Sequence, residues 1–293
     1  MKIAFIGSIE FSRQALELLI KMGEDVVGVC TLKESPFNSD HYDLSGICKE
    51  YGISWKYTPN INSEETIKWL ANKNPDVVFC FGWSKILGKK LLNLAPKGVI
   101  GFHPAALPAN RGRHPLIWSL VLGLKETAST FFFMDEGIDS GDILSQRKIE
   151  ISDEDDAAIL YKKVTLSALE QIKIFLQQLN SGNPPRIVQD SRHGNTWRKR
   201  SKADGEIDWR MSAISIHNLV RGLAKPYVGA HFLYQGREIK VWKTEIVTGV
   251  LNNIEPGKIV SSEEINVVVK CGIHAIKLLK TEPEFNPTIE EYL

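Results

Sequence analysis

The first third of the chain alternates short apolar runs with segments whose apolar residues recur at helical spacing. The runs at residues 2–6, 25–30, 76–81 and 98–102 are too short for helices and are rich in Val, Ile and Phe. Strands that read as continuous apolar runs are buried on both faces of a sheet. The alternation therefore predicts an α/β fold with a doubly wound, mostly parallel, Rossmann-like sheet. Ligands of such sheets bind beyond the carboxyl ends of the strands.

The pattern changes after residue 125. A long helix is expected over residues 154–179 and a shorter one over 213–223, and short strands are expected at 230–234, 238–242, 257–260, 265–270 and 275–279. Short strands separated by turns predict a small β-rich, OB-like domain. Residues 192–202 hold five Lys or Arg and no acid, which suits a linker. We predict a catalytic domain at 1–190, a linker at 191–203 and a C-terminal domain at 204–293.

Composition narrows the possible partners. Lys and Arg number 36 against 35 Asp and Glu, so no overall charge draws the chain to nucleic acid or to an anionic membrane. No apolar stretch approaches the roughly 20 residues that a membrane span needs. The four cysteines are scattered without a CxxC pair, which suits a reducing compartment. We expect a cytoplasmic protein with neither a membrane partner nor a metal.

The ends of two predicted strands differ in the chemistry that they suggest. The first turn has a single glycine, Gly7, and lacks the GxGxxG spacing of dinucleotide-binding folds. His103 ends an apolar strand and enters a loop stiffened by Pro104 and Pro108. A histidine at this place suits general acid–base catalysis. A satisfied core or capping histidine fits the same residues equally well.

Two further loops complete the set of candidates. Asp139 belongs to an acid-rich loop, residues 135–142, that suits orientation of a histidine, a solvated turn or a cation site. Its spacing does not fit an EF-hand. The segment FGWSKIL at residues 81–87 suits a loop lying against a flat ligand, although Trp83 could instead belong to the core.

Together, FGWSKIL, HPAALPANRG and MDEGIDSGDIL resemble the folate-dependent formyltransferase family. The opening IAFIGSIEFSRQALELL is similar to the start of the family's members. The segment IDWRMSAISIHNLVRGLAKPYVGAHF resembles the beginning of their C-terminal domain. The resemblance covers nearly the whole chain and implies transfer of a formyl group from N10-formyltetrahydrofolate to an amine.

The resemblance also implies the site. The family's catalytic His and Asp fall on His103 and Asp139, but its catalytic Asn falls on Gly101. Loss of one oxyanion donor costs about 2.7–4 kcal/mol, so we expect a substitute donor, with Asn110 as a candidate. Asn110 and Arg111 are the expected substrate-binding residues. The expected folate-binding residues are Phe81, Trp83, Ser84, Lys85, Leu87, Asp135 and Glu136.

The acceptor is predicted from charge and from the resemblance. Residues 202–293 hold eleven Lys or Arg and twelve Asp or Glu, a poor match for a polyanion. The loop at residues 31–43 is not basic either. We therefore expect a nucleotide-linked amino sugar, its phosphates met by Arg111, with no nucleic-acid partner and a possible homodimer. Methionyl-tRNA is the alternative acceptor, and an inactive folate- or nucleotide-binding relative is the second alternative because of Gly101.

Overall fold

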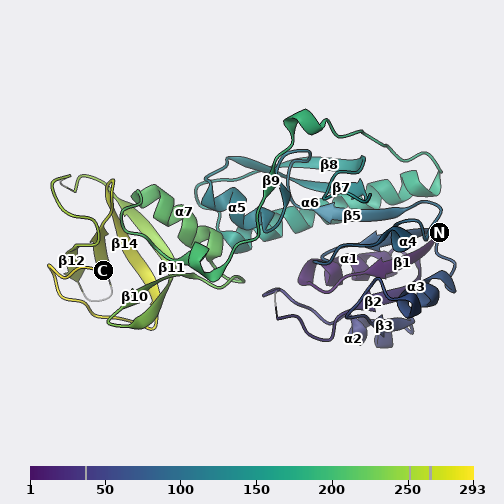
Figure 1. Cartoon of the computed structure of the whole chain (residues 1–293), viewed down its shortest axis with the longest axis horizontal. Helices are drawn as coiled ribbons and strands as arrows, with labels where there is room; N and C mark the ends of the chain where they lie inside the picture. The colour runs from purple at the N-terminus through teal and green to yellow at the C-terminus, as the bar shows by residue number, and fades with distance from the viewer. Residues whose placement is uncertain (37, 251, 264–265) are drawn as a thin grey trace. The chain divides into compact units, whose positions relative to one another are not determined.

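The computed structural model describes residues 1–36, 38–250, 252–263 and 266–293 (Figure 1). Phe37, in the loop at 31–43, and Ile265, in a predicted strand, lie outside this range. The contacts divide the chain into two compact units. Unit 1 comprises Met1–Gly112, Ala128–Ile149 and Lys163–Trp197, and unit 2 comprises Arg113–Thr127, Glu150–Lys162 and Arg198–Leu293. The chain passes from unit 1 to unit 2 for the last time after Trp197, within the predicted linker. The earlier passages between the units have no counterpart in the sequence prediction.

A seven-stranded sheet forms the centre of unit 1. Its strands are β1 (Lys2–Ile6), β2 (Asp25–Thr31), β3 (Trp55–Tyr57), β4 (Val77–Cys80), β5 (Val99–His103), β7 (Glu126–Phe133) and β8 (Ile143–Glu150). The order is β3-β2-β1-β4-β5-β7-β8. The first five strands of this order pair in parallel, whereas β7 is antiparallel to β5. The predicted mostly parallel α/β sheet is confirmed.

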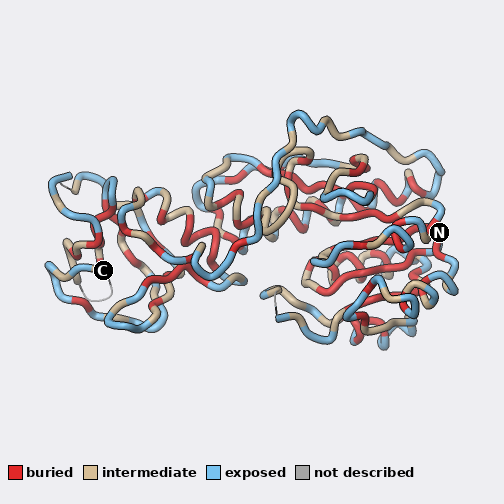
Figure 2. The backbone as a smooth tube through the Cα atoms, in the orientation of Figure 1, coloured by how far each residue is buried: buried red, intermediate tan, exposed pale blue. Residues whose placement is uncertain are grey.

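The inner strands are buried because helices cover both faces of the sheet. Figure 2 shows the backbone of these strands in red. These helices are α1 (Glu10–Lys21), α2 (Ser45–Glu50), α3 (Glu64–Ala71), α4 (Lys89–Leu92) and α6 (Ala157–Asn180). The hydroxyl of Ser63 caps α3 by accepting from Thr66 N, and two glutamates follow in the first turn. Phe81 and Phe175 both contact Phe131 in the core, with ring centroids 5.2 and 4.8 Å away.

Unit 2 contains a five-stranded antiparallel sheet, which confirms the predicted β-rich C-terminal part. Its strands, in spatial order, are β10 (Ala230–Tyr234), β11 (Arg237–Val247), β14 (Ala275–Glu282), β13 (Asn266–Lys270) and β12 (Ile259–Glu263). Helices α5 (Pro115–Val121) and α7 (Ala213–Leu223) pack together here. Ile216, Leu219, Val220 and Leu223 form the buried stripe of α7.

The segment predicted as a linker is ordered. It contains the 3₁₀ turns η1 (Ser191–His193) and η2 (Lys202–Gly205) and the short strand β9 (Thr196–Trp197). Strand β9 pairs in parallel with β6 (Arg111–Gly112), in the loop that follows His103. The backbone of residues 196–197 therefore belongs to unit 1. Among the helices of the described ranges, none is both long and apolar enough to cross a membrane.

Candidate active site

His103 ends β5, and its ring is buried between two polar partners. Its Nε2 lies 2.8 Å from the carbonyl oxygen of Asn110, and its Nδ1 lies 3.6 Å from Oδ2 of Asp139. A carbonyl oxygen only accepts, so Nε2 carries a proton. In neutral imidazole Nδ1 then faces the carboxylate without a proton, and in imidazolium it faces the carboxylate with one. Both ring nitrogens therefore face an acceptor atom.

Asp139 reaches His103 by an indirect route. Because β7 runs antiparallel to β5, its last residue, Phe133, lies beside Ile100 and not beyond His103. The loop that follows turns back, and Asp139 adopts a left-handed backbone with φ of 51°. Its Oδ2 accepts from the backbone N–H of Gly112 at 2.9 Å. The carboxylate is therefore held by the loop that also carries Asn110.

The position of the family's asparagine is crowded. A Cβ added at Gly101 would lie 2.8 Å from Cγ and 3.0 Å from Sδ of Met134, and 3.0 Å from Cζ of Phe132. Met134 thus fills the space that a side chain at Gly101 would need. The contact between Asn110 and His103 uses the Asn110 carbonyl and not its amide, so Asn110 as a substitute donor stays a prediction.

The predicted folate-binding residues fall into two groups, one in the core and one at the surface. The ring of Phe81 is fully buried among other aromatic rings, and Leu87 is buried in the core cluster against which Trp83 and Met134 pack. Phe81 and Leu87 therefore belong to the core that supports the loop. The indole Nε1 of Trp83 is buried and has no hydrogen-bond partner among the described residues. Burial of an N–H group without a partner is costly.

The remaining predicted folate-binding residues lie at the loop surfaces. Ser84 Oγ donates to Asn38 Oδ1 at 3.2 Å, and the Lys85 ammonium donates to the carbonyl of Pro59. Asp135 Oδ1 accepts from Gly137 N and Ser140 Oγ, which organises its own loop. Glu136 forms an exposed 3.0 Å ion pair with Lys89.

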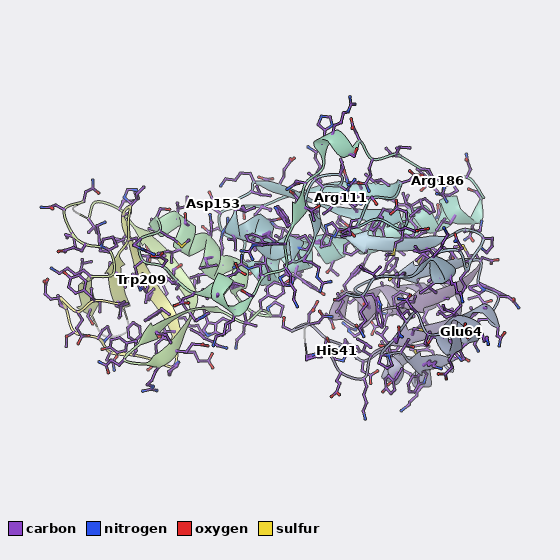
Figure 3. The ribbon with its side chains drawn as sticks, viewed as in Figure 1. His41, Glu64, Arg111, Asp153, Arg186 and Trp209 are labelled. Atoms are coloured by element: carbon purple, nitrogen blue, oxygen red, sulfur yellow. The ribbon has the colours of Figure 1, made fainter. Side chains whose placement is uncertain are left out.

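Arg111 lies on β6, in the loop after His103 (Figure 3). Its Nη2 donates to Oε1 of Gln189 at 2.7 Å, while its Nε is buried without a partner in the described part of the chain. Trp83 Nε1 and Arg111 Nε are the two N–H groups of the predicted site residues that are buried without a partner among the described residues. Two amide side chains from residues 187–197, Gln189 and Asn195, contact the loops of the site, and no sequence motif marked them.

Comparison with protein families decides the family of the chain. Residues 1–177 match the formyl transferase family, and residues 199–290 match the formyl transferase C-terminal domain. The chain belongs to the formyl transferase family. The predicted family and its formyl-transfer chemistry are confirmed.

The relatives in this family differ in acceptor. Methionyl-tRNA formyltransferase of Caldanaerobacter subterraneus subsp. tengcongensis is 32% identical over 300 residues, covering 100% of this chain and 96% of its own. The enzyme of the same name from Ruminiclostridium cellulolyticum is 33% identical with the same coverage. Among solved structures, the sugar 3N-formyltransferase WlaRD superposes with a TM-score of 0.73 at 17% identity, covering 97% of this chain and 99% of its own. At that identity the likeness shows the fold alone.

The predicted amino-sugar acceptor is therefore wrong. The full-length relatives at 32–33% identity are named for methionyl-tRNA, whereas the sugar enzyme has half that identity. The error has a physical cause. The prediction averaged charge over residues 202–293, but binding of a polyanion depends on where cations gather on a surface.

Proposed function

We propose that this protein transfers the formyl group of N10-formyltetrahydrofolate to the amino group of methionyl-tRNA. The observation that carries the proposal is its similarity, over its whole length, to methionyl-tRNA formyltransferases at 32–33% identity. The geometry of unit 1 supplies the chemistry of the transfer, and a cationic cluster in unit 2 supports the RNA acceptor.

The folate co-substrate supplies an electrophilic formyl carbon when bound. His103 can take the proton lost by the attacking amine, and Asp139 stabilises the imidazolium that results. His103 would then return the proton to N10 as the bond between N10 and the formyl carbon breaks. Alternatively, His103 can donate a hydrogen bond to the developing oxyanion. Because Nε2 already donates to the Asn110 carbonyl, it reaches a substrate only if that carbonyl moves away. Nδ1 faces Asp139 at a distance too long for a hydrogen bond and needs no such movement.

Residues of unit 1 fit a ligand of this kind. The buried, unpaired N–H groups of Trp83 and Arg111 suit the acceptor atoms of a pterin, a carboxylate or a phosphate. Trp83 and Leu87 offer the apolar surface of the folate loop, and Phe81 supports it from the core. We assign Ser84, Lys85, Asp135 and Glu136 to the rim of this folate site, and Asn110 and Arg111 to the acceptor side.

A cationic cluster in unit 2 suits the RNA backbone. Arg198 and Arg200 lie over the ring of Trp118, at 5.3 and 4.6 Å from its centroid. Burial lowers the pKa of His114, and the nearby charges of Arg113, Arg200 and Lys199 lower it further. We call Arg113, Arg198, Lys199 and Arg200 the cationic cluster. Arg198 and Lys199 are exposed, whereas Arg200 is buried. Asp204 accepts from Arg198 and offsets part of the charge.

The test is formylation of initiator methionyl-tRNA by the purified chain with N10-formyltetrahydrofolate. We expect formylmethionyl-tRNA to form, and we expect His103→Ala to abolish its formation. Formylation of an amino-sugar nucleotide with none of the tRNA would overturn the proposed acceptor. A parallel assay with uncharged tRNA separates formylation of the aminoacyl group from RNA binding alone.

A further inference from the structure

The side chain of Gln189 joins two loops of the active site. Its Oε1 accepts from Arg111 Nη2 at 2.7 Å, and its Nε2 donates to the carbonyls of Asp139 and Gly141 at 2.9 and 2.7 Å. Both donors and the acceptor of the amide are therefore engaged. Gln189 is half-buried, so these bonds are partly shielded from water.

Asp139 needs such support. Its φ of 51° places a non-glycine residue in the left-handed region. A backbone of this kind persists only where its surroundings determine it, and such residues cluster at functional sites. Gln189 holds the carbonyl of Asp139, and Gly112 holds its carboxylate. The residue is thus fixed at its main chain and at its side chain.

Asn195 makes the corresponding contact on the other loop. Asn110 is also left-handed, with φ of 64°, and its N–H donates to Oδ1 of Asn195 at 2.6 Å. The carbonyl of Asn110 is the group that faces His103 Nε2. Asn195 is exposed, so its bond competes with water and is worth less than those of Gln189.

We infer that Gln189 is a positioning residue for formyl transfer: its amide fixes the backbone of Asp139 so that the carboxylate faces His103. The inference rests on formyl transfer at His103 and Asp139, and it is independent of which amine accepts the group. Gln189 lies beyond the long helix α6 and outside the three motifs that resemble the family.

Two substitutions separate the contacts of Gln189. Gln189→Glu keeps an oxygen for Arg111 but turns a carboxylate oxygen toward two carbonyls, so it removes the donors to Asp139 and Gly141. Gln189→Met keeps the approximate volume and removes all three bonds. The matched control is Gln177→Glu, which makes the same change on an exposed part of α6.

The first readout is structural and does not depend on any substrate. In crystal structures of both variants we expect Asp139 to leave the left-handed region, or its carboxylate to move by about 1 Å or more from His103, a displacement large enough to impair catalysis. The Gln177→Glu control should leave it in place. An unchanged Asp139 in both Gln189 variants would overturn the inference, whatever the acceptor proves to be.

The second readout is kinetic. We expect kcat to fall roughly 10- to 100-fold in both variants, while KM for the folate changes by less than about threefold. In an Asp139→Asn background the same substitutions should cost little more, because Gln189 acts through Asp139. An equal additional loss in that background would show a role unconnected with Asp139. Wild-type activity on methionyl-tRNA, measured alongside, reports separately on the proposed acceptor.

Discussion

Nδ1 of His103 lies 3.6 Å from Oδ2 of Asp139, and the same oxygen accepts from the backbone N–H of Gly112 at 2.9 Å. The carboxylate is therefore anchored by the main chain of the neighbouring loop, and the imidazole is its second partner. A separation of 3.6 Å exceeds a hydrogen bond, but catalytic contacts of this kind commonly tighten once substrate is bound. The pair is placed for an electrostatic role that grows as the imidazole becomes charged.

Removing either member of this pair should impair turnover more than folding. We expect His103→Ala and Asp139→Asn each to lower kcat by at least about 100-fold, because the first removes the proton carrier and the second removes the charge that stabilises imidazolium. Steady-state formylation kinetics measure the loss, and circular dichroism checks the fold. A variant that turns over at close to the wild-type rate would exclude its residue from the catalytic pair.

The substitution Gly101→Asn should not raise the activity above that of the wild type. Met134 Cγ lies 2.8 Å from where the new Cβ would sit, so the methionine must move before the amide can point toward a substrate. We expect Gly101→Asn to lower the thermal midpoint, and Gly101→Asn with Met134→Ala to recover part of it. Differential scanning fluorimetry and kcat measured on all three proteins test this. Equal thermal midpoints for the single variant and the wild type would show that Met134 moves aside without a loss of stability.

Much of unit 1 was predictable because its strands are buried on both faces. Continuous apolar runs predict β1, β4 and β5. The run at β5 also predicts that His103 lies at the end of a strand. The sequence pattern does not encode strand direction, so the antiparallel β7 and the returning loop with Asp139 could not be derived from it. The family motif supplied Asp139, and the geometry that brings it back to His103 is a finding of the structure.

The secondary structure within residues 191–203 could not be predicted for a different reason. A short polar stretch with many cations is typical of a solvated linker, and two-residue strands such as β9 have no detectable period. Pairing of β9 with β6 is a tertiary contact between distant parts of the chain. The contacts of Gln189 and Asn195 could not be predicted either, because a single amide side chain forms no recognisable sequence pattern.

Reversing one charge of the cationic cluster should weaken RNA binding and its dependence on salt. We expect Lys199→Glu to lower affinity for methionyl-tRNA and to reduce the slope of log K against log salt by about 1. Lys280→Glu, which makes the same charge change on β14, is the control. Filter binding at several salt concentrations gives both slopes. Identical slopes for the two variants would remove the cluster from the RNA-binding surface.

Unit 2 should lose stability in mild acid. Burial, and then the charge of Arg221, lower the pKa of His217, whose Nδ1 lies 3.0 Å from Thr244 Oγ1. The unfolded chain therefore takes up a proton near pH 6.5 that the folded unit resists, so stability is complete above this pH and falls below it. The pKa of His114 is lowered too and acts in the same direction.

Urea midpoints at pH 7.5 and 5.5 measure this effect. We expect the wild type to be less stable at pH 5.5, and we expect His217→Asn, which keeps a polar atom near Thr244, to show a smaller difference between the two pH values. A difference that His217→Asn leaves unaltered would assign the acid sensitivity to other groups.

The pairing of β6 with β9 sets where this chain can be cut. The match to the formyl transferase family ends at residue 177, before Gln189, Asn195 and β9. A fragment that stops there would retain His103 and Asp139 but leave Arg111 and the Asn110 N–H without their amide partners. Any recombinant catalytic half, and any chimaera that exchanges C-terminal halves between relatives, must therefore carry its own residues through Trp197.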